Sequence, residues 1–478
     1  MVELVGFIAY PSRPREVGEA VRAAQTLLRD EHGCHGLSTW EENDIAGRCL
    51  VDPILTKIEQ SNLLIADITR LNFNVLYEVG FAIGKKKRVF LVKNRALTSD
   101  EDLIQEVGIF DTLGYQEYEN SQQLAGAILK IDDLIPLKFD ERDVNVKQPV
   151  YVVTPLQKTD LEVRLLSRIK KARLQFRTFD PEEQGRLSAR EAIENVARSH
   201  GVVIPLRPKG YVGADVHNFR AAFVSGLAHG MGKLLLLLQC KDDPVPLDYR
   251  DSVSRYSFPQ DIDDYIADFA GEITDRLQSS VSPVVSEPKT FLARLHLGAS
   301  SAENEMRDLG NYYLETDEYQ RTLRGEVQIV AGRKGAGKTA LFVQVRDKLR
   351  QNKQIVVLDL KPEGFQLVKF KELVLDLLEE GTKEHTLTAF WEYLLLLETC
   401  QKLLEKDKTS HLRNDQLYKP YRSLAETYQG DDFVAEGDFA ERMTKLIQGI
   451  AEDFQSASAN CRCSGHRGNR RFTTSWTK

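Results

Sequence analysis

The chain has 478 residues with 42% hydrophobic and 28% charged side chains, values that are ordinary for a soluble globular protein. Its formal net charge of −7 gives no reason to expect a nucleic-acid-binding surface. The longest aliphatic run, residues 234–238, is far shorter than the ~20 residues of a membrane-spanning helix, and no signal peptide is evident. The six scattered cysteines do not form a disulfide framework, so we expect a cytoplasmic protein without a membrane partner. The length favours about three domains.

Residues 1–140 alternate short apolar runs with helical patterns. Strands are predicted at 4–9, 36–40, 63–66 and 89–92, with helices at 16–29 and 46–60. Such alternation is typical of parallel βαβ units and predicts a flavodoxin-like (Rossmann-type) α/β domain. Residues 140–148 are charged and lack apolar periodicity, so we expect a linker between this domain and the next.

Residues 148–280 repeat the pattern and predict a second, degenerate copy of the same fold. Strands are predicted at 150–154, 174–179 and 202–206, with helices at 160–172 and 189–198. When Gly80 is aligned with Gly226, Gly84 falls on Gly230, and Val224 stands where the first copy has Glu78. The second copy therefore lacks this carboxylate. The alternative is that two helices of this fold class look alike only because both are rich in small residues.

Residues 61–92 carry the most informative pattern in the chain. An apolar run ends at Asp67, and a polar turn with Asn72 and Asn74 follows. A helical segment that opens with Tyr77 and Glu78 then leads into the next apolar run. Asp67 is therefore expected at the carboxyl end of a strand, and Glu78 in the first turn of the next helix. Ligands of open α/β sheets bind at that edge, so both carboxylates are candidates for sugar or nucleotide chemistry.

The segment resembles the nucleoside 2-deoxyribosyltransferase-like superfamily, whose relatives include TIR-like domains that cleave nicotinamide dinucleotides. The hallmark is a hydrophobic strand ending in Ala-Asp, an Asn-rich loop and then Tyr-Glu-x-Gly-x-Ala. The matching residues are Ala66, Asp67, Asn72, Asn74, Tyr77, Glu78, Gly80 and Ala82. The resemblance covers roughly the N-terminal quarter of the chain.

Cleavage of an N-glycosidic bond builds positive charge on the ribose ring, so a carboxylate is needed beside the anomeric carbon. The resemblance implies that Glu78 is the nucleophile and that Asp67 contacts the sugar or assists proton transfer to the leaving base. It also implies substrate contacts for Tyr10, Asn72, Asn74 and Tyr77. Taken singly, Glu78 has the alternative role of a helix-start carboxylate that complements the helix dipole, and Asp67 that of a turn cap.

A second strong motif lies at residues 332–339, which read G-x-x-x-x-G-K-T between a predicted strand at 327–331 and a predicted helix at 339–350. In such a P-loop the backbone N–H groups cradle phosphate oxygens, the lysine reaches the β and γ phosphates, and the hydroxyl binds Mg²⁺. Another strand is predicted at 355–360, where Asp359 is the nearest candidate for a further Mg²⁺-binding acid. The residues expected to bind ATP and Mg²⁺ are Gly332, Gly335, Gly337, Lys338 and Thr339.

The P-loop motif predicts a STAND-like P-loop NTPase domain over residues 290–455. Residues 456–478 lack acidic side chains and apolar periodicity, so we expect them to be disordered. We also expect this tail to be foreign to the NTPase domain, which would then be truncated. The sequence therefore predicts an ATP-regulated homo-oligomer that cleaves or transfers an N-glycosidic bond. By analogy with proteins of similar domain architecture, we expect it to act in bacterial defence or signalling. Two alternatives stay open: a non-catalytic nucleotide sensor coupled to ATP-driven oligomerisation, and an incomplete fragment with neither activity.

Overall fold

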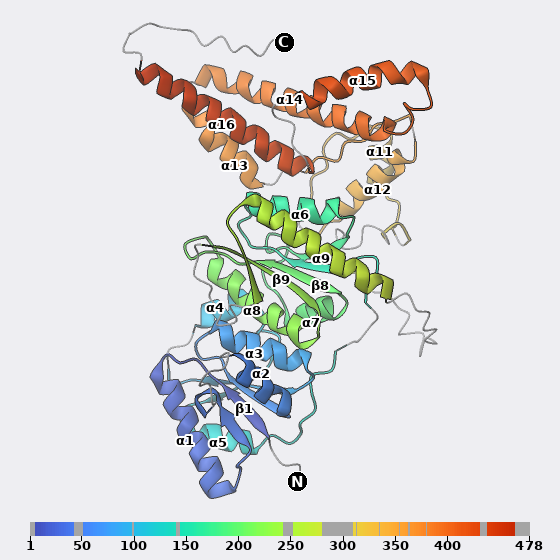
Figure 1. The fold of residues 1–478 in the computed structure, drawn as a ribbon. Coiled ribbons are helices and arrows are strands. Elements are labelled where there is room, and N and C mark those ends of the chain that lie inside the picture. The colour runs from blue at the N-terminus through green and yellow to red at the C-terminus, as the bar shows by residue number, and fades with distance from the viewer. Residues whose placement is uncertain are drawn as a thin grey trace. The chain divides into compact units, whose positions relative to one another are not determined.

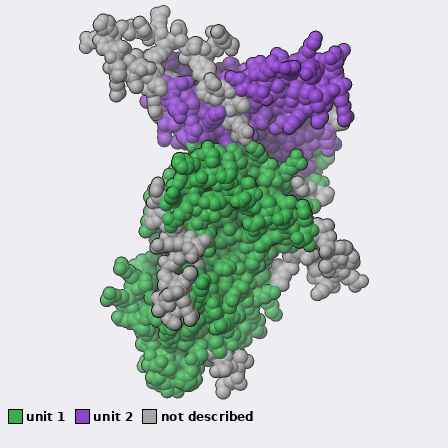
Figure 2. All heavy atoms as spheres, viewed as in Figure 1, with its two compact units in different colours: residues 1–343 green, residues 344–478 purple. Residues whose placement is uncertain are grey.

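A computed structural model gives the arrangement of most of the chain, which forms two compact units, residues 1–343 and 344–478 (Figure 2). Both predicted α/β copies belong to the first unit. The structure describes residues 5–42, 51–97, 100–139, 144–241, 252–279, 309–311, 313–333, 335–352, 354–361, 364–378, 380–430 and 437–463.

The first copy is built on a five-stranded parallel sheet with the order β2-β1-β3-β4-β5 (Figure 1). Helices α1 and α5 share a buried core with one face of this sheet, and α3 shares one with the other face. The four strands predicted here are confirmed, and β5 is an addition. The strands are β1 (Gly6–Ala9), β2 (Leu37–Thr39), β3 (Leu63–Asp67), β4 (Arg88–Asn94) and β5 (Tyr115–Tyr118). The helices are α1 (Arg15–His32), α2 (Val51–Gln60), α3 (Phe73–Gly84), α4 (Glu101–Val107) and α5 (Ser121–Leu129).

The second copy has its own five-stranded parallel sheet with the order β10-β9-β8-β6-β7. Read from its other edge, the order is β7-β6-β8-β9-β10, which matches the order of the first sheet strand for strand. The predicted duplication requires this match. The registers match as well, because Leu63 pairs with Arg88 in one sheet and Gly201 with Leu234 in the other. The strands are β6 (Val150–Val153), β7 (Phe176–Phe179), β8 (Gly201–Pro205), β9 (Leu234–Cys240) and β10 (Val253–Tyr256). The helices are α6 (Asp160–Lys171), α7 (Ala189–Ala197), α8 (Ala214–Gly230) and α9 (Pro259–Ser279).

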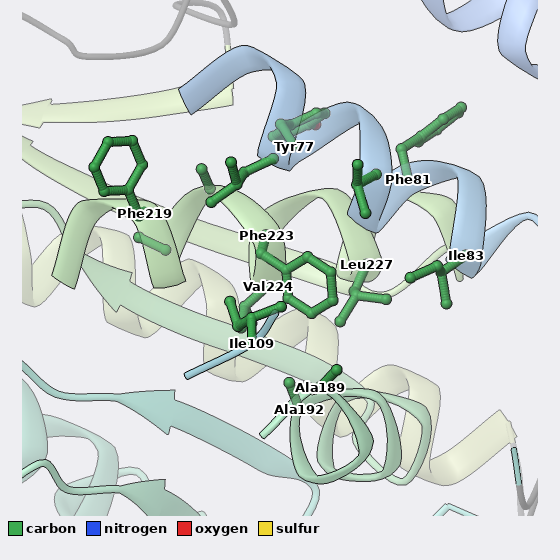
Figure 3. Close-up of a cluster of buried hydrophobic side chains, with 14 of the residues drawn as sticks. Tyr77, Phe81, Ile83, Ile109, Ala189, Ala192, Phe219, Phe223, Val224 and Leu227 are labelled. Carbon is green, nitrogen blue, oxygen red and sulfur yellow. The ribbon is translucent and has the colours of Figure 1, made fainter. Parts of the chain in front are cut away.

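Helices α3 and α8 join the two copies by packing against each other along most of the length of α3 (Figure 3). Phe73, the first residue of α3, stacks on Phe219 with ring centroids 4.2 Å apart. Gly84 and Gly230, the last residues of the two helices, also lie in contact. The two helices therefore run in the same direction.

This close packing depends on glycines at matching positions. A Cβ atom added to Gly80 would lie 2.2 Å from the carbonyl oxygen of Phe223, and one added to Gly226 would lie 2.0 Å from that of Tyr77. Both distances are far below van der Waals contact, so only glycine lets the two backbones approach this closely. Phe223 and Tyr77 are themselves equivalent in the alignment of the two copies. Each helix therefore offers the other the same surface, as in a two-fold symmetric dimer.

The segments around the P-loop motif do not form the predicted sheet. Residues 327–331 and 355–360 contain no strand, and Ile329 is 84% exposed. An extended segment becomes a strand only when a neighbour takes up its backbone hydrogen bonds, and no strand of the described ranges pairs with either segment. The two predicted strands are therefore wrong. The helix predicted after the motif is confirmed as α12 (Lys338–Arg350).

The second unit is helical in its described part. Phe370 stacks on Phe390 with ring centroids 4.1 Å apart, and Met443 belongs to the same buried cluster. α16 extends beyond the predicted boundary at residue 456, and the rest of the predicted disordered ending, residues 464–478, lies outside the described residues. None of the described helices combines the length and apolar character needed to cross a bilayer. The helices are α13 (Gly364–Leu373), α14 (Glu380–Asp407), α15 (Asp415–Gln429) and α16 (Phe439–Cys463), and α11 (Asp317–Leu323) precedes the P-loop in the first unit.

Candidate functional site

The carboxyl ends of the parallel strands β1 to β5 meet at one edge of the first sheet, where the sequence predicts a site. Asp67 is the last residue of β3 and is fully buried. Its Oδ1 accepts a hydrogen bond from the backbone N–H of Thr69 (2.9 Å), and its Oδ2 accepts one from the Tyr118 hydroxyl (2.6 Å). The Thr69 hydroxyl accepts a further bond from the backbone N–H of Asn94 (2.7 Å). This network ties together the ends of β3, β4 and β5.

Burial raises the pKa of Asp67, although the hydrogen bonds from Tyr118 and Thr69 oppose the shift. A folded-state pKa above the unfolded value of 3.8 means that the fold favours the protonated carboxyl. Its contribution to stability is therefore present at low pH and is lost as the pH rises through the raised pKa. We expect the free energy of unfolding, measured by urea titration from about pH 4 to about pH 7, to fall more steeply in the wild type than in Asp67→Asn. Parallel curves would contradict the shift.

Two aromatic residues at the same edge carry unused polar atoms. Tyr10 follows β1, Trp40 follows β2, and their ring centroids are 5.8 Å apart. Tyr10 Oη and Trp40 Nε1 are buried and make no hydrogen bond of normal geometry in the part of the chain that the structure describes, although Thr39 and Glu41 lie close to the Tyr10 hydroxyl. Leaving such a group unsatisfied costs about 1–3 kcal/mol, a cost that a ligand acceptor would remove. Burial, together with the carboxylate of Glu41, raises the pKa of Tyr10 to about 12, so this hydroxyl stays protonated at neutral pH.

Glu78 lies in the interior of α3 and not in its first turn. The helix begins at Phe73, a turn earlier than predicted, because Asn72 caps it. The Asn72 Oδ1 atom accepts hydrogen bonds from the backbone N–H groups of Asn74 (2.9 Å) and Val75 (3.2 Å). The predicted first-turn position is therefore wrong, and Glu78 does not act as a helix-start charge. Its side chain is buried, with 6% of the residue exposed.

The first sheet separates the two predicted carboxylates. Side chains alternate along a strand, so Asp67 points to the same face as Ile65, which shares a core with α1, Tyr10 and Tyr118. Helix α3, which carries Glu78, packs on the opposite face. The two carboxylates can therefore meet one ligand only where both faces end, at the carboxyl edge.

Tyr77 lies in the contact between α3 and α8 (Figure 3). The residue is fully buried, and its hydroxyl shares a hydrogen bond of 2.7 Å with Nδ1 of His229. Packing against the second copy accounts for the position of the Tyr77 side chain, so Tyr77 is not part of the proposed site. Asn72 is engaged as the helix cap, and Asn74 is half-buried in the first turn of α3.

The second sheet does not carry the same acids at its edge. In the matched registers Pro205 stands at the position of Asp67, and Val224 stands at that of Glu78. Any chemistry that needs these two carboxylates is therefore confined to the first copy.

The P-loop motif has glycines in the conformation that such a loop needs. Gly335 and Gly337 have φ angles of +82° and +79°, in the left-handed region that favours glycine. Lys338 opens α12, and its Nζ donates hydrogen bonds to the carbonyl oxygens of Gly332 (2.8 Å) and Arg333 (2.9 Å). The ammonium group is thus folded back over the loop, where the β and γ phosphates of a nucleotide would take the place of these carbonyls.

The P-loop motif supplies fewer residues for binding a metal ion than for binding phosphate. Thr339 follows Lys338 in the first turn of α12, as the motif requires for a Mg²⁺ ligand. Asp359 forms an ion pair with Arg346 at 2.8 Å, so its charge is already compensated. Within the described ranges, no group of three or more His, Cys, Asp or Glu residues is arranged to hold a metal ion.

Comparisons with known proteins give little further guidance. No protein-family model and no solved structure matches the chain. A protein of Escherichia coli (strain K12), described as "Putative transposon gamma-delta 80.3 kDa protein", is 26% identical over 137 residues. The match covers 28% of this chain and 20% of that protein, so the chain spans about a fifth of the length of this relative. The name of the relative does not bear on nucleotide or glycosidic chemistry.

Proposed function

We propose that the first copy, a flavodoxin-like domain, binds a nucleoside, nucleotide or NAD-type dinucleotide at the carboxyl edge of its sheet and cleaves or transfers the N-glycosidic bond. The observation that carries the proposal is the pair of buried polar atoms at this edge, Tyr10 Oη and Trp40 Nε1, which make no hydrogen bond of normal geometry with the described residues. The strand order reverses between β1 and β3, and ligands of doubly wound sheets bind at such a switch point. Tyr10 and Trp40 end the two strands on one side of that point.

The chain offers a carboxylate for each half of the reaction. Glu78 would attack the anomeric carbon, so that the C–N bond breaks, the base leaves and a glycosyl ester forms. Asp67, whose pKa is raised by burial, is suited to deliver a proton to the departing base. Water or a second base then takes up the glycosyl group and regenerates Glu78. Tyr10, which stays protonated, would donate a hydrogen bond to the substrate.

A base-release assay tests this proposal directly. The full chain is incubated with NAD and, separately, with nucleosides, and free nicotinamide or base is measured by chromatography. We expect base to accumulate in proportion to the protein concentration. Saturable binding without any release would reject the enzymatic function and favour the second candidate below, and the absence of both would reject both.

The second candidate is a nucleotide sensor whose output is ATP-driven oligomerisation with further copies of the chain. Two observations favour it: both Asp67 oxygens accept hydrogen bonds from within the fold, and Glu78 is only 6% exposed. Carboxylates held in this way support recognition of a ligand more readily than turnover. A cytoplasmic location and a part in bacterial defence or signalling belong to both proposals, by analogy of architecture.

We expect ATP with Mg²⁺ to raise the melting temperature of the wild type and not that of Lys338→Ala. A ligand present at a hundred times its Kd stabilises the folded state by about 2.7 kcal/mol, and the variant loses the group that reaches the β and γ phosphates. Lys348→Ala, an exposed lysine of the same helix, serves as the control and should keep the full response. An equal rise in all three proteins would place ATP elsewhere.

A further inference from the structure

A cavity of about 550 Å³ lies beside the end of β4 and the start of β5. Helix α4 and residues 110–114 contribute to its walls. Neither Glu78 nor Asp67 lines it, so the cavity is distinct from the residues assigned to glycosidic chemistry. The polar and aromatic side chains that face it are Lys93, Glu101, Gln105, Asp111, Thr112 and Tyr115.

Lys93 is the unusual member of this lining, because it is a cation with only 4% of its surface exposed. Its Nζ forms an ion pair with Glu101 Oε1 at 2.8 Å. Burying an ammonium group costs several kcal/mol unless an anion compensates it. Here the compensating carboxylate belongs to a side chain that is 68% exposed. A ligand anion that enters the cavity would therefore compete with Glu101 for the Lys93 ammonium.

The remaining lining favours an anion that also carries a flat ring. Tyr115 is 41% exposed, and the Lys93 ammonium lies over its ring, 5.4 Å from the ring centroid, so a partly exposed aromatic ring adjoins the charge. Asp111, the other acidic residue, is paired with Arg186 at 3.0 Å and is thus partly neutralised. Thr112 is fixed by accepting a hydrogen bond from a backbone N–H of the second copy (2.9 Å).

The charge is a feature of the first copy alone. Lys93 follows Val92, which pairs with the last residue of β3, and Gln239 follows Leu238, which pairs with the last residue of β8. Gln239 therefore occupies the equivalent position in the second copy without a charge. The basic group is not required by the fold that the two copies share.

We propose that this cavity binds a small anion bearing a planar group, of the nucleoside monophosphate class, with the phosphate on Lys93 and the ring against Tyr115. Lysine binds phosphate as a compact point charge, and aromatic faces stack on nucleobases. The site does not depend on the proposed glycosidic function, because it uses none of the same side chains.

Calorimetric titration of AMP into the full chain tests this site, with Lys338→Ala as the background so that the P-loop does not contribute. Lys93→Gln, which installs the residue of the second copy, should weaken AMP binding at least about tenfold. Glu101→Gln should strengthen it several-fold, because the competing carboxylate is gone. Adenosine, which lacks the phosphate, should bind equally to all three proteins.

The opposite responses of the two variants separate a ligand site from a structural ion pair. If Lys93 and Glu101 only fasten α4 to the sheet, both variants should melt earlier and leave AMP binding unchanged, and this result would overturn the proposal. So would a lack of saturable binding to the wild-type cavity. Should Lys93→Gln fail to fold, Tyr115→Ala alters a half-exposed ring and is expected to weaken AMP binding several-fold without lowering the melting temperature. Unchanged affinity in that variant would be equally decisive against the site.

Discussion

Replacing Gly226 with alanine is expected to lower the free energy of unfolding by about 2–3 kcal/mol, although alanine is the better helix former. The added Cβ would lie 2.0 Å from the carbonyl oxygen of Tyr77 and 2.9 Å from the backbone nitrogen of Phe81. Backbone atoms cannot rotate aside as the end of a side chain can, so α3 and α8 must separate and lose packing along their shared surface. The loss should appear as a lower midpoint of urea unfolding.

Gly271 provides a matched control, because it is also a helical glycine of the second copy and a Cβ there meets no atom within 4 Å. Gly271→Ala is expected to stabilise the protein by about 0.5–1 kcal/mol, since alanine loses less backbone entropy in a helix. The same chemical change should thus have opposite effects at the two positions. Similar small gains at both would show that α3 and α8 are not in backbone contact.

The Glu78→Gln variant is expected to release base at least about a thousandfold more slowly than the wild type. An amide can neither form a glycosyl ester nor place a negative charge beside the ribose cation. Glutamine has nearly the same volume as glutamate, so the buried site should keep its packing and ATP binding should persist. Chromatography of the released base over time measures the rate, and nucleotide-dependent melting checks the fold.

Glu19→Gln makes the same change at an exposed position on α1 and should keep the full rate. Undiminished release by Glu78→Gln would remove this residue from the chemistry and require another nucleophile. Loss of release together with loss of the ATP response would indicate misfolding, and the milder Glu78→Asp, which keeps the charge, would then decide whether the carboxylate matters.

Most of the two sheets could be predicted from sequence, because their central strands are apolar runs separated by helical patterns. Two strands that the predictions do not include, β5 and β10, lie at sheet edges and read YQEY and VSRY. An edge strand pairs on one side only and can be polar, so hydropathy does not reveal it. After residue 337 the local motif predicts the helix correctly, but a strand depends on neighbours that no local pattern supplies.

The candidate site was only partly predictable for related reasons. The motif places Asp67 at a strand end and Glu78 on the next helix, but it does not tell which face of the sheet each carboxylate occupies. The resemblance implies a sugar contact for Asn72, whereas in the structure its side chain caps the start of α3. Tyr118 and Trp40 were missed as site residues because each is recognisable only once non-adjacent strands have been brought side by side.

The pairing of α3 with α8 has a consequence for how the side chains of the two copies can differ. In a dimer of identical chains, every substitution appears in both subunits, and the two subunits dissociate on dilution. Here both helices belong to one polypeptide, so their association is intramolecular and independent of concentration. A substitution in one half therefore need not appear in the other, and Pro205 and Val224 stand in the second copy where the first copy has Asp67 and Glu78. A single polypeptide can thus keep one shared packing surface while its two sheet edges carry different side chains.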